Sequence, residues 1–108
     1  MMNPYMQETE NALVHTYNRF PVIFEKGEGV YLYDTEGKKY LDFAAGIAVC
    51  GLGYGNPELT AAVKEQTELL WHTSNLFYNA SCGTAAEALK KASGMDRVFF
   101  TNSGTEAN

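Results

Sequence analysis

The chain has 108 residues, of which 45% are apolar and 19% charged, a balance typical of one small globular domain rather than a disordered chain. Eight basic and thirteen acidic residues give a net charge of −5 and are mixed along the chain, which disfavours a nucleic-acid-binding surface. The longest apolar run, residues 43–52, is too short to span a membrane.

The N-terminal residues are polar and leave no room for the basic region and apolar core of a secretory signal, so we expect a cytoplasmic protein. Apolar residues at Leu13, Val14 and Tyr17 predict a short amphipathic helix over residues 9–17. Pro21 is expected to end it.

A β-hairpin is predicted next. Residues 30–33 and 39–43 are rich in β-branched and aromatic side chains and predict two short strands, joined by a turn at residues 34–37. We expect Leu32 and Leu41 to be buried in this hairpin, which is too small to be stable by itself.

Residues 44–55 combine glycines with small apolar residues, which predicts an irregular segment whose backbone passes close to a ligand or to another part of the chain. Gly51, Gly53 and Gly55 do not have the spacing of a dinucleotide-binding fingerprint. We therefore interpret them as a tight loop leading into the next helix.

Two helices are predicted after this loop. Asn56 as N-cap and Pro57 at the first helical position begin the first, and apolar residues continue at helical spacing to Leu70. Ser81 is expected to cap the second helix, and Gly94 is its predicted end.

The cysteines and histidines indicate no metal site. Cys50 and Cys82 are too few and too far apart for a disulfide framework or a zinc site, and we interpret each as a small buried residue. His15 has no acidic or cysteine partner nearby and is expected to be exposed. His72 is interpreted as a cap for backbone carbonyls rather than a catalytic group.

The last segment suggests a phosphate-binding turn. Residues 98–101 predict a buried strand, which makes the order helix, strand, helix of an α/β layer. After it, Ser103, Gly104 and Thr105 form a turn at the start of a helix, where free amides and hydroxyls bind anions. From spacing alone, an ordinary helix cap at Asn102 or Ser103 explains the segment equally well.

The chain stops at Asn108, just after this helix begins, so we expect it to be the N-terminal part of a longer protein. The alternative is a truncated, non-catalytic piece that folds only with a partner.

The string Asn-Ser-Gly-Thr-Glu-Ala-Asn at residues 102–108 resembles the phosphate-binding motif of the class-III aminotransferases, pyridoxal-phosphate enzymes of fold type I. The His-Thr-Ser-Asn-Leu-Phe-Tyr string at residues 72–78 is similar to the acetylornithine and succinylornithine branch in particular. Further segments resemble the family in the correct order, at residues 17–21, 27–29, 33–43 and 45–49.

The resemblance implies an α/β fold that forms the N-terminal part of a fold-type-I transferase. Residues 1–79 would be the N-terminal arm, hairpin and helix of the smaller domain. Residues 80–108 would begin the large domain that binds pyridoxal 5'-phosphate. A homodimer is also implied, with Asn75 near its interface.

The resemblance also assigns site residues. Ser103, Gly104 and Thr105 would hold the cofactor phosphate, while Tyr17 and Ile47 would border the substrate pocket. Ornithine-specific relatives carry a tyrosine at the position of Ile47, so an aliphatic residue favours an acylated ornithine or another ω-amino acid. The resemblance as a whole implies N-acetylornithine as amino donor and 2-oxoglutarate as acceptor, in arginine biosynthesis. Ornithine, succinylornithine and 4-aminobutyrate remain alternative donors. The family's catalytic lysine would lie beyond the last residue, so no catalytic residue is assigned here.

Overall fold

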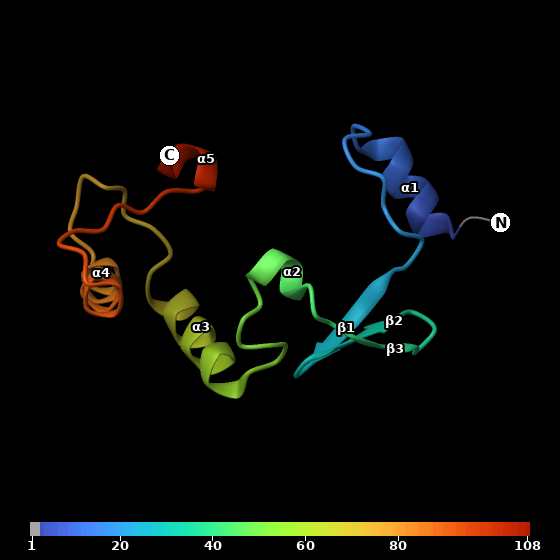
Figure 1. Cartoon of the computed structure of the whole chain (residues 1–108), viewed down its shortest axis with the longest axis horizontal. Helices are drawn as coiled ribbons and strands as arrows, with labels where there is room; N and C mark the ends of the chain where they lie inside the picture. The colour runs from blue at the N-terminus through green and yellow to red at the C-terminus, as the bar shows by residue number, and fades with distance from the viewer. Residues whose placement is uncertain (1–2) are drawn as a thin grey trace. The chain divides into compact units, whose positions relative to one another are not determined.

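The computed structural model describes residues 3–108, and its contacts divide the chain into two compact units with the boundary between Glu65 and Gln66. In chain order the elements are α1 (Pro4–Ala12), β1 (Phe24–Glu28), β2 (Tyr31–Asp34), β3 (Lys39–Leu41), α2 (Ala45–Ala48), α3 (Pro57–Leu69), α4 (Ala80–Ser93) and α5 (Gly104–Ala107) (Figure 1). The boundary falls inside α3. It does not test the division at residues 79 and 80, which stays a prediction.

Helix α1 begins earlier than the sequence pattern indicated. The side chain of Asn3 accepts a hydrogen bond of 3.0 Å from the Tyr5 amide, and a proline follows this cap directly. Leu13 already has extended backbone and ends the helix. The predicted helix over residues 9–17 is therefore wrong in its bounds, because the cap and proline start the helix one to two turns upstream.

The three strands form one antiparallel sheet in the order β1-β2-β3. In this register Leu32 lies opposite Gly27 on β1 and opposite Tyr40 on β3. Strands β2 and β3 confirm the predicted hairpin, and β1 adds a third strand to its open side.

The turn of the hairpin is organised by one carboxylate. Asp34 Oδ1 accepts hydrogen bonds from the amides of Glu36 and Lys38, at 3.0 and 2.9 Å. Asp34 Oδ2 accepts a bond of 2.8 Å from the Tyr40 hydroxyl. Gly37 has a φ of 78°, so a glycine occupies the left-handed position of the turn.

The segment after the hairpin contains an unusual turn. Residues 45–48, which make up α2, all have positive φ, at 47°, 62°, 62° and 64° in chain order. Only Gly46 among them lacks a Cβ atom. The turn is therefore left-handed, a conformation that L-residues rarely adopt in succession. The predicted irregular segment is confirmed, and its irregularity is greater than glycine content alone suggested.

Helix α3 begins where the sequence predicted. Asn56 Oδ1 accepts a hydrogen bond of 2.9 Å from the Leu59 amide, as an N-cap does. The helix ends at Leu69, one residue before the predicted end.

Helix α4 is capped by a different residue from the one predicted. The side chain of Asn79, rather than Ser81, accepts a hydrogen bond of 3.2 Å from the Cys82 amide. Asn79 has the extended backbone of an N-cap, whereas Ser81 already lies inside the helix. Gly94 has a left-handed φ of 72° and ends the helix, which confirms that prediction.

Residues 98–101 do not form a strand within the described part of the chain. A strand requires backbone hydrogen bonds to a neighbour, and among the described residues this segment has none of the partners that a sheet would supply. The apolar pattern indicated a segment with strand propensity, but it carried no information about which strand would pair with it.

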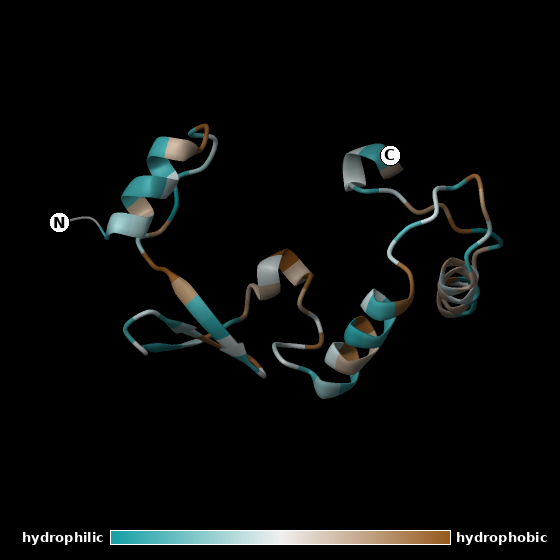
Figure 2. Ribbon diagram, turned by 180° about the vertical axis from the view of Figure 1, so that it is seen from behind, coloured by the Kyte–Doolittle hydropathy of each residue, from teal (hydrophilic) through white to brown (hydrophobic). Residues whose placement is uncertain are grey.

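No residue in the described part of the chain is buried. Among the elements of residues 3–65, contacts between elements are made by the strands alone, β1 with β2 and β2 with β3. Leu41 is 53% exposed and Cys82 is exposed, while Leu32 and Cys50 are half-buried, so the predicted burial of these four is wrong. Apolar segments at the start of β1 and in part of α2, brown in Figure 2, are left uncovered.

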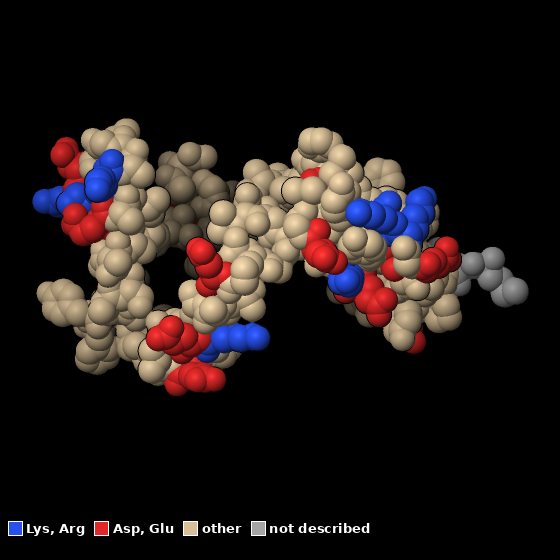
Figure 3. All heavy atoms as spheres, turned by 90° about the horizontal axis from the view of Figure 1, so that it is seen from below, with Lys and Arg blue, Asp and Glu red and all other residues tan. Residues whose placement is uncertain are grey.

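Charge is distributed as the sequence predicted. On the face shown in Figure 3, lysine and arginine side chains lie among aspartate and glutamate side chains rather than in a patch of one sign. In residues 3–108 no helix has the length and apolar character required to cross a bilayer.

Candidate functional site

The start of α5 holds the three residues predicted to bind phosphate, with Ser103 as the N-cap and Gly104 and Thr105 as the first two helical residues. Ser103 has extended backbone, and its Oγ accepts a hydrogen bond of 3.2 Å from the Glu106 amide. The Glu106 carboxylate in turn accepts a bond of 2.8 Å from the Asn102 amide, which closes the turn from the other side. The amides of Gly104 and Thr105 donate to no group among the described residues. The structure therefore brings a helix cap and two unpaired donors together.

This donor set fits a phosphate group. A Cβ atom placed on Gly104 would meet nothing within 4 Å, so the space above the turn is open. The two free amides lie at the positive end of α5, where an anion is favoured. The hydroxyls of Ser103 and Thr105 add two more donors. Ser103 Oγ accepts from the Glu106 amide, so its own O–H remains free to donate to an anion. Cap and phosphate-binding turn, which the sequence left as alternatives, are compatible here.

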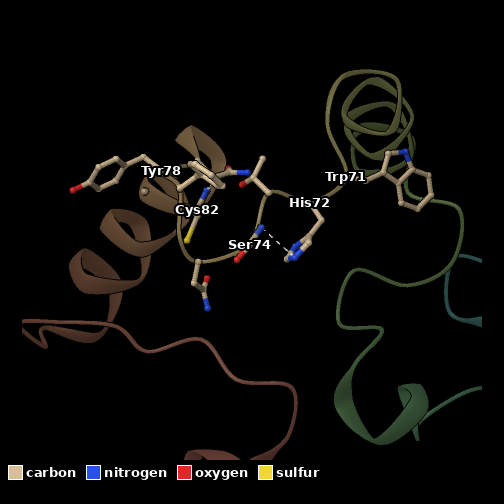
Figure 4. A pocket seen from close by; sticks show the side chains of 10 residues that line it. Trp71, His72, Ser74, Tyr78 and Cys82 are labelled. Atoms are coloured by element: carbon tan, nitrogen blue, oxygen red, sulfur yellow. Dashed lines mark hydrogen bonds between the residues drawn. The ribbon is translucent and has the colours of Figure 1, made fainter.

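The loop between α3 and α4 and the first turn of α4 line an open pocket of about 440 Å³ in the second unit. His72 Nε2 accepts a hydrogen bond of 3.1 Å from the Ser74 amide, drawn as a dashed line in Figure 4. His72 thus caps an amide of its own loop and not a carbonyl, which corrects the predicted role. Ser74 has a φ of 65°, so this bond holds a strained backbone position.

The side chains around this pocket are mostly exposed. In Figure 4, Trp71 and Tyr78 extend away from the loop in opposite directions. Asn75, which the resemblance placed near a dimer interface, is exposed on the same loop, and that placement stays a prediction.

The predicted substrate residues lie in the first unit. Tyr17 is 72% exposed and follows α1, and Ile47 is 93% exposed in the left-handed turn α2. Both side chains are therefore available for contact, and their role at a substrate pocket stays a prediction.

A hydrogen-bonded pair of side chains, Asp42 and Tyr54, lies beside the left-handed turn α2, and no sequence pattern indicated it. Asp42 Oδ2 accepts a hydrogen bond of 2.5 Å from the Tyr54 hydroxyl. Asp42 Oδ1 accepts from the amides of Ala44 and Ala45, at 2.9 and 3.0 Å. The hydrogen bond to Asp42 raises the pKa of Tyr54 to about 12. The bond from Tyr54, followed by that from the Ala45 amide, lowers the pKa of Asp42.

A second cluster corrects the prediction for His15. Its Nδ1 donates to Glu10 Oε2 at 2.9 Å, and Arg19 donates to Glu10 Oε1 at 3.2 Å. The side chain of His15 is exposed as expected, but it has the acidic partner that its sequence surroundings did not suggest. The hydrogen bond from His15 is the main cause of a lowered pKa at Glu10.

The chain is similar to proteins of one enzyme family along most of its length. A sequence model described as Aminotransferase class-III matches residues 12–108. The acetylornithine aminotransferase of Gloeobacter violaceus is 55% identical over 102 residues, which are 94% of this chain and 26% of that protein. The chain thus spans about a quarter of the length of such relatives.

Solved structures give the same result. The N-acetylornithine aminotransferase of Stenotrophomonas maltophilia is 52% identical, with a TM-score of 0.77 over 86% of this chain and 26% of that one. The ornithine delta-aminotransferase of Plasmodium falciparum is 31% identical, with a TM-score of 0.89 over 95% of this chain and 27% of that one. The predicted mixture of helix and strand, as part of a pyridoxal-phosphate transferase fold, is confirmed.

Proposed function

Because the chain belongs to the class-III aminotransferase family, we propose that it is the N-terminal part of an acetylornithine aminotransferase. This enzyme would transfer an amino group between N-acetylornithine and 2-oxoglutarate in arginine biosynthesis. The support is identity of 55% and 51% to curated proteins of that name across at least 92% of the chain. Activity and substrates are proposed because the chain spans only about a quarter of those relatives.

The observation that carries the cofactor assignment is the pair of unpaired amides at the start of α5. The class-III family depends on pyridoxal phosphate, which when bound supplies the electron sink for amino-group transfer. We propose that the amides of Gly104 and Thr105 and the hydroxyl of Ser103 bind its phosphate. Gly104 leaves room for the anion, since no atom lies near the position of its missing Cβ.

Ile47 is proposed to set the choice of donor. Its exposed aliphatic side chain suits an acylated amine better than a free ammonium group, which requires a polar or charged partner. Tyr17 is proposed to border the same pocket. Two acetylornithine enzymes among the solved structures are 52% and 36% identical to the chain, against 31% for the Plasmodium falciparum ornithine enzyme, which supports N-acetylornithine as donor.

The assembly is part of the proposal. The loop after α3 exposes Trp71, Leu76, Phe77 and Tyr78, which are large apolar side chains that a second subunit would cover. We therefore propose a cytoplasmic homodimer with Asn75 near the interface. A second candidate is a non-catalytic piece that requires a partner to fold, favoured by the lack of any buried residue in the described part of the chain.

The test is a comparison of donors in the intact protein that contains this chain. Purified with pyridoxal phosphate and 2-oxoglutarate, it should turn over N-acetylornithine with a kcat/KM at least about tenfold above that for ornithine. Equal rates, or a preference for ornithine, would contradict the assignment to Ile47. Absence of turnover with either donor would favour the non-catalytic alternative.

A further inference from the structure

Asp42 and Tyr54 form a clamp at the base of the turn that presents Ile47. One carboxylate oxygen of Asp42 accepts from the amides of Ala44 and Ala45, where the turn begins. The other accepts from the hydroxyl of Tyr54, beyond the end of the turn. We call these two residues the Asp42–Tyr54 clamp.

The turn needs such support. Its backbone is left-handed at four successive residues, 45–48. Ile47 is β-branched, and a β-branched residue at positive φ is a genuine outlier because its side chain crowds the backbone. Conformations of this kind persist only where the surroundings over-determine them.

Tyr54 is itself fixed to the sheet. Its amide donates to the Gly29 carbonyl at 2.8 Å, and its carbonyl accepts from the Gly29 amide at 2.9 Å. Its ring packs against Gly27 so closely that a Cβ atom there would overlap it. Gly53 lies close to Gly29 as well, since a Cβ on Gly53 would approach the Gly29 carbonyl oxygen to 2.5 Å. Contacts with Gly27 and Gly29 thus fix the position of Tyr54, and the Tyr54 hydroxyl in turn fixes the Asp42 carboxylate.

We propose that Asp42 and Tyr54 are positioning residues for donor recognition, which hold the turn Ala45–Ala48 in its left-handed form and so fix where Ile47 meets the substrate. This inference rests on the proposed function. Neither residue touches the substrate in this account, and both act through the turn.

The hairpin offers a matched control. Asp34 accepts from two amides through Oδ1 and from the Tyr40 hydroxyl through Oδ2, which is the same arrangement in a turn without a proposed substrate contact. Tyr54→Phe and Tyr40→Phe each remove one hydroxyl and keep the ring. Asp42→Asn is a second variant, because its amide oxygen still accepts from Ala44 and Ala45.

The experiment uses the intact holoenzyme and two measurements. Tyr54→Phe should raise the KM for N-acetylornithine about fivefold or more with a smaller change in kcat, as expected when a substrate contact is misplaced. Tyr40→Phe should leave both parameters within about twofold of the original enzyme. Asp42→Asn should fall between them.

Hydrogen exchange of the same variants reports on the turn without any catalysis. Tyr54→Phe should speed exchange in residues 44–48 by about tenfold or more and leave residues 34–38 unchanged. Tyr40→Phe should show the reverse pattern.

The outcomes separate the two proposals. If the unmodified enzyme does not use N-acetylornithine, the proposed function fails and the donor-positioning inference fails with it, while exchange still reports whether the clamp orders the turn. If the enzyme uses N-acetylornithine but Tyr54→Phe matches Tyr40→Phe in KM, the inference alone is overturned. Unchanged exchange at residues 44–48 in Tyr54→Phe would also overturn it.

Discussion

Two turns in the first unit are each stabilised by an aspartate that accepts hydrogen bonds from two backbone amides and a tyrosine hydroxyl, although their backbone conformations differ. In the hairpin, Asp34 binds two amides and the Tyr40 hydroxyl, and its tyrosine is six residues away. In the loop, Asp42 binds two amides and the Tyr54 hydroxyl, at a separation of twelve residues. The hairpin turn places a glycine at its left-handed position, whereas three of the four left-handed positions of the loop turn hold alanine or isoleucine. The hairpin is thus specified locally, and the loop depends on a partner distant in sequence.

The electrostatics of the two carboxylates differ accordingly. At Asp34 the largest single influence is partial desolvation, which raises the pKa, but the hydrogen bonds from Tyr40 and the two amides, together with the charge of Lys38, lower it overall. At Asp42 the hydrogen bond from Tyr54 is the largest influence and lowers the pKa directly. Tyr40 has further support from an edge-to-face contact with Phe24, at 5.3 Å between ring centroids. Burial therefore opposes ionisation of Asp34 more than any single hydrogen bond favours it, whereas at Asp42 the bond from Tyr54 outweighs burial.

The largest expected change in the free energy of unfolding comes from replacing glycine by alanine in the hairpin turn and alanine by glycine in the loop turn. Gly37→Ala in the hairpin should destabilise the intact protein by about 1–2 kcal/mol, because a Cβ atom is strained at a φ of 78°. Ala48→Gly in the loop should stabilise it by about 1 kcal/mol, because the strain at a φ of 64° is removed.

Urea unfolding of both variants measures these changes. Ala48→Gly leaves the side chain of Ile47 in place, so it also separates strain from substrate contact. Loss of stability in Ala48→Gly would contradict the claim that the loop turn is strained, and no loss in Gly37→Ala would break the contrast between the turns.

A smaller effect concerns the pH range over which the Asp42–Tyr54 clamp contributes. The pKa of Tyr54 is raised from 10.0 to about 12, so its contribution is full below pH 10 and is lost as pH rises toward 12. The pKa of Asp42 is lowered from 3.8, so its contribution is present above about pH 4 and is lost as pH falls through the lowered value.

Ultraviolet titration of tyrosinate, with Tyr54→Phe as the reference, isolates the alkaline limit. The difference between the two proteins should show one tyrosine that ionises near pH 12. Ionisation of that tyrosine near pH 10 would mean that the hydrogen bond to Asp42 is not retained in solution.

The sequence was most informative where structure depends on neighbouring residues. The N-cap at Asn56, the helix end at Gly94 and the hairpin turn each require groups within one turn of chain, and all three were predicted correctly. The cap at Asn79 was missed because Ser81, two residues on, is an equally competent cap by type.

Longer-range features could not be predicted from the same rules. The Asp42–Tyr54 hydrogen bond depends on how Gly29 pairs with Tyr54, which no local pattern encodes. The apolar pattern of residues 98–101 identified a segment suited to a sheet but could not supply a partner strand. Of the candidate site, the turn at Ser103 was predicted in geometry, while the roles of Tyr17 and Ile47 stay predictions.

The most direct test of the account is a crystal structure of the intact enzyme with pyridoxal phosphate. The account predicts phosphate oxygens about 3 Å from the amide nitrogens of Gly104 and Thr105. A phosphate bound elsewhere, with these two amides facing only solvent, would contradict it.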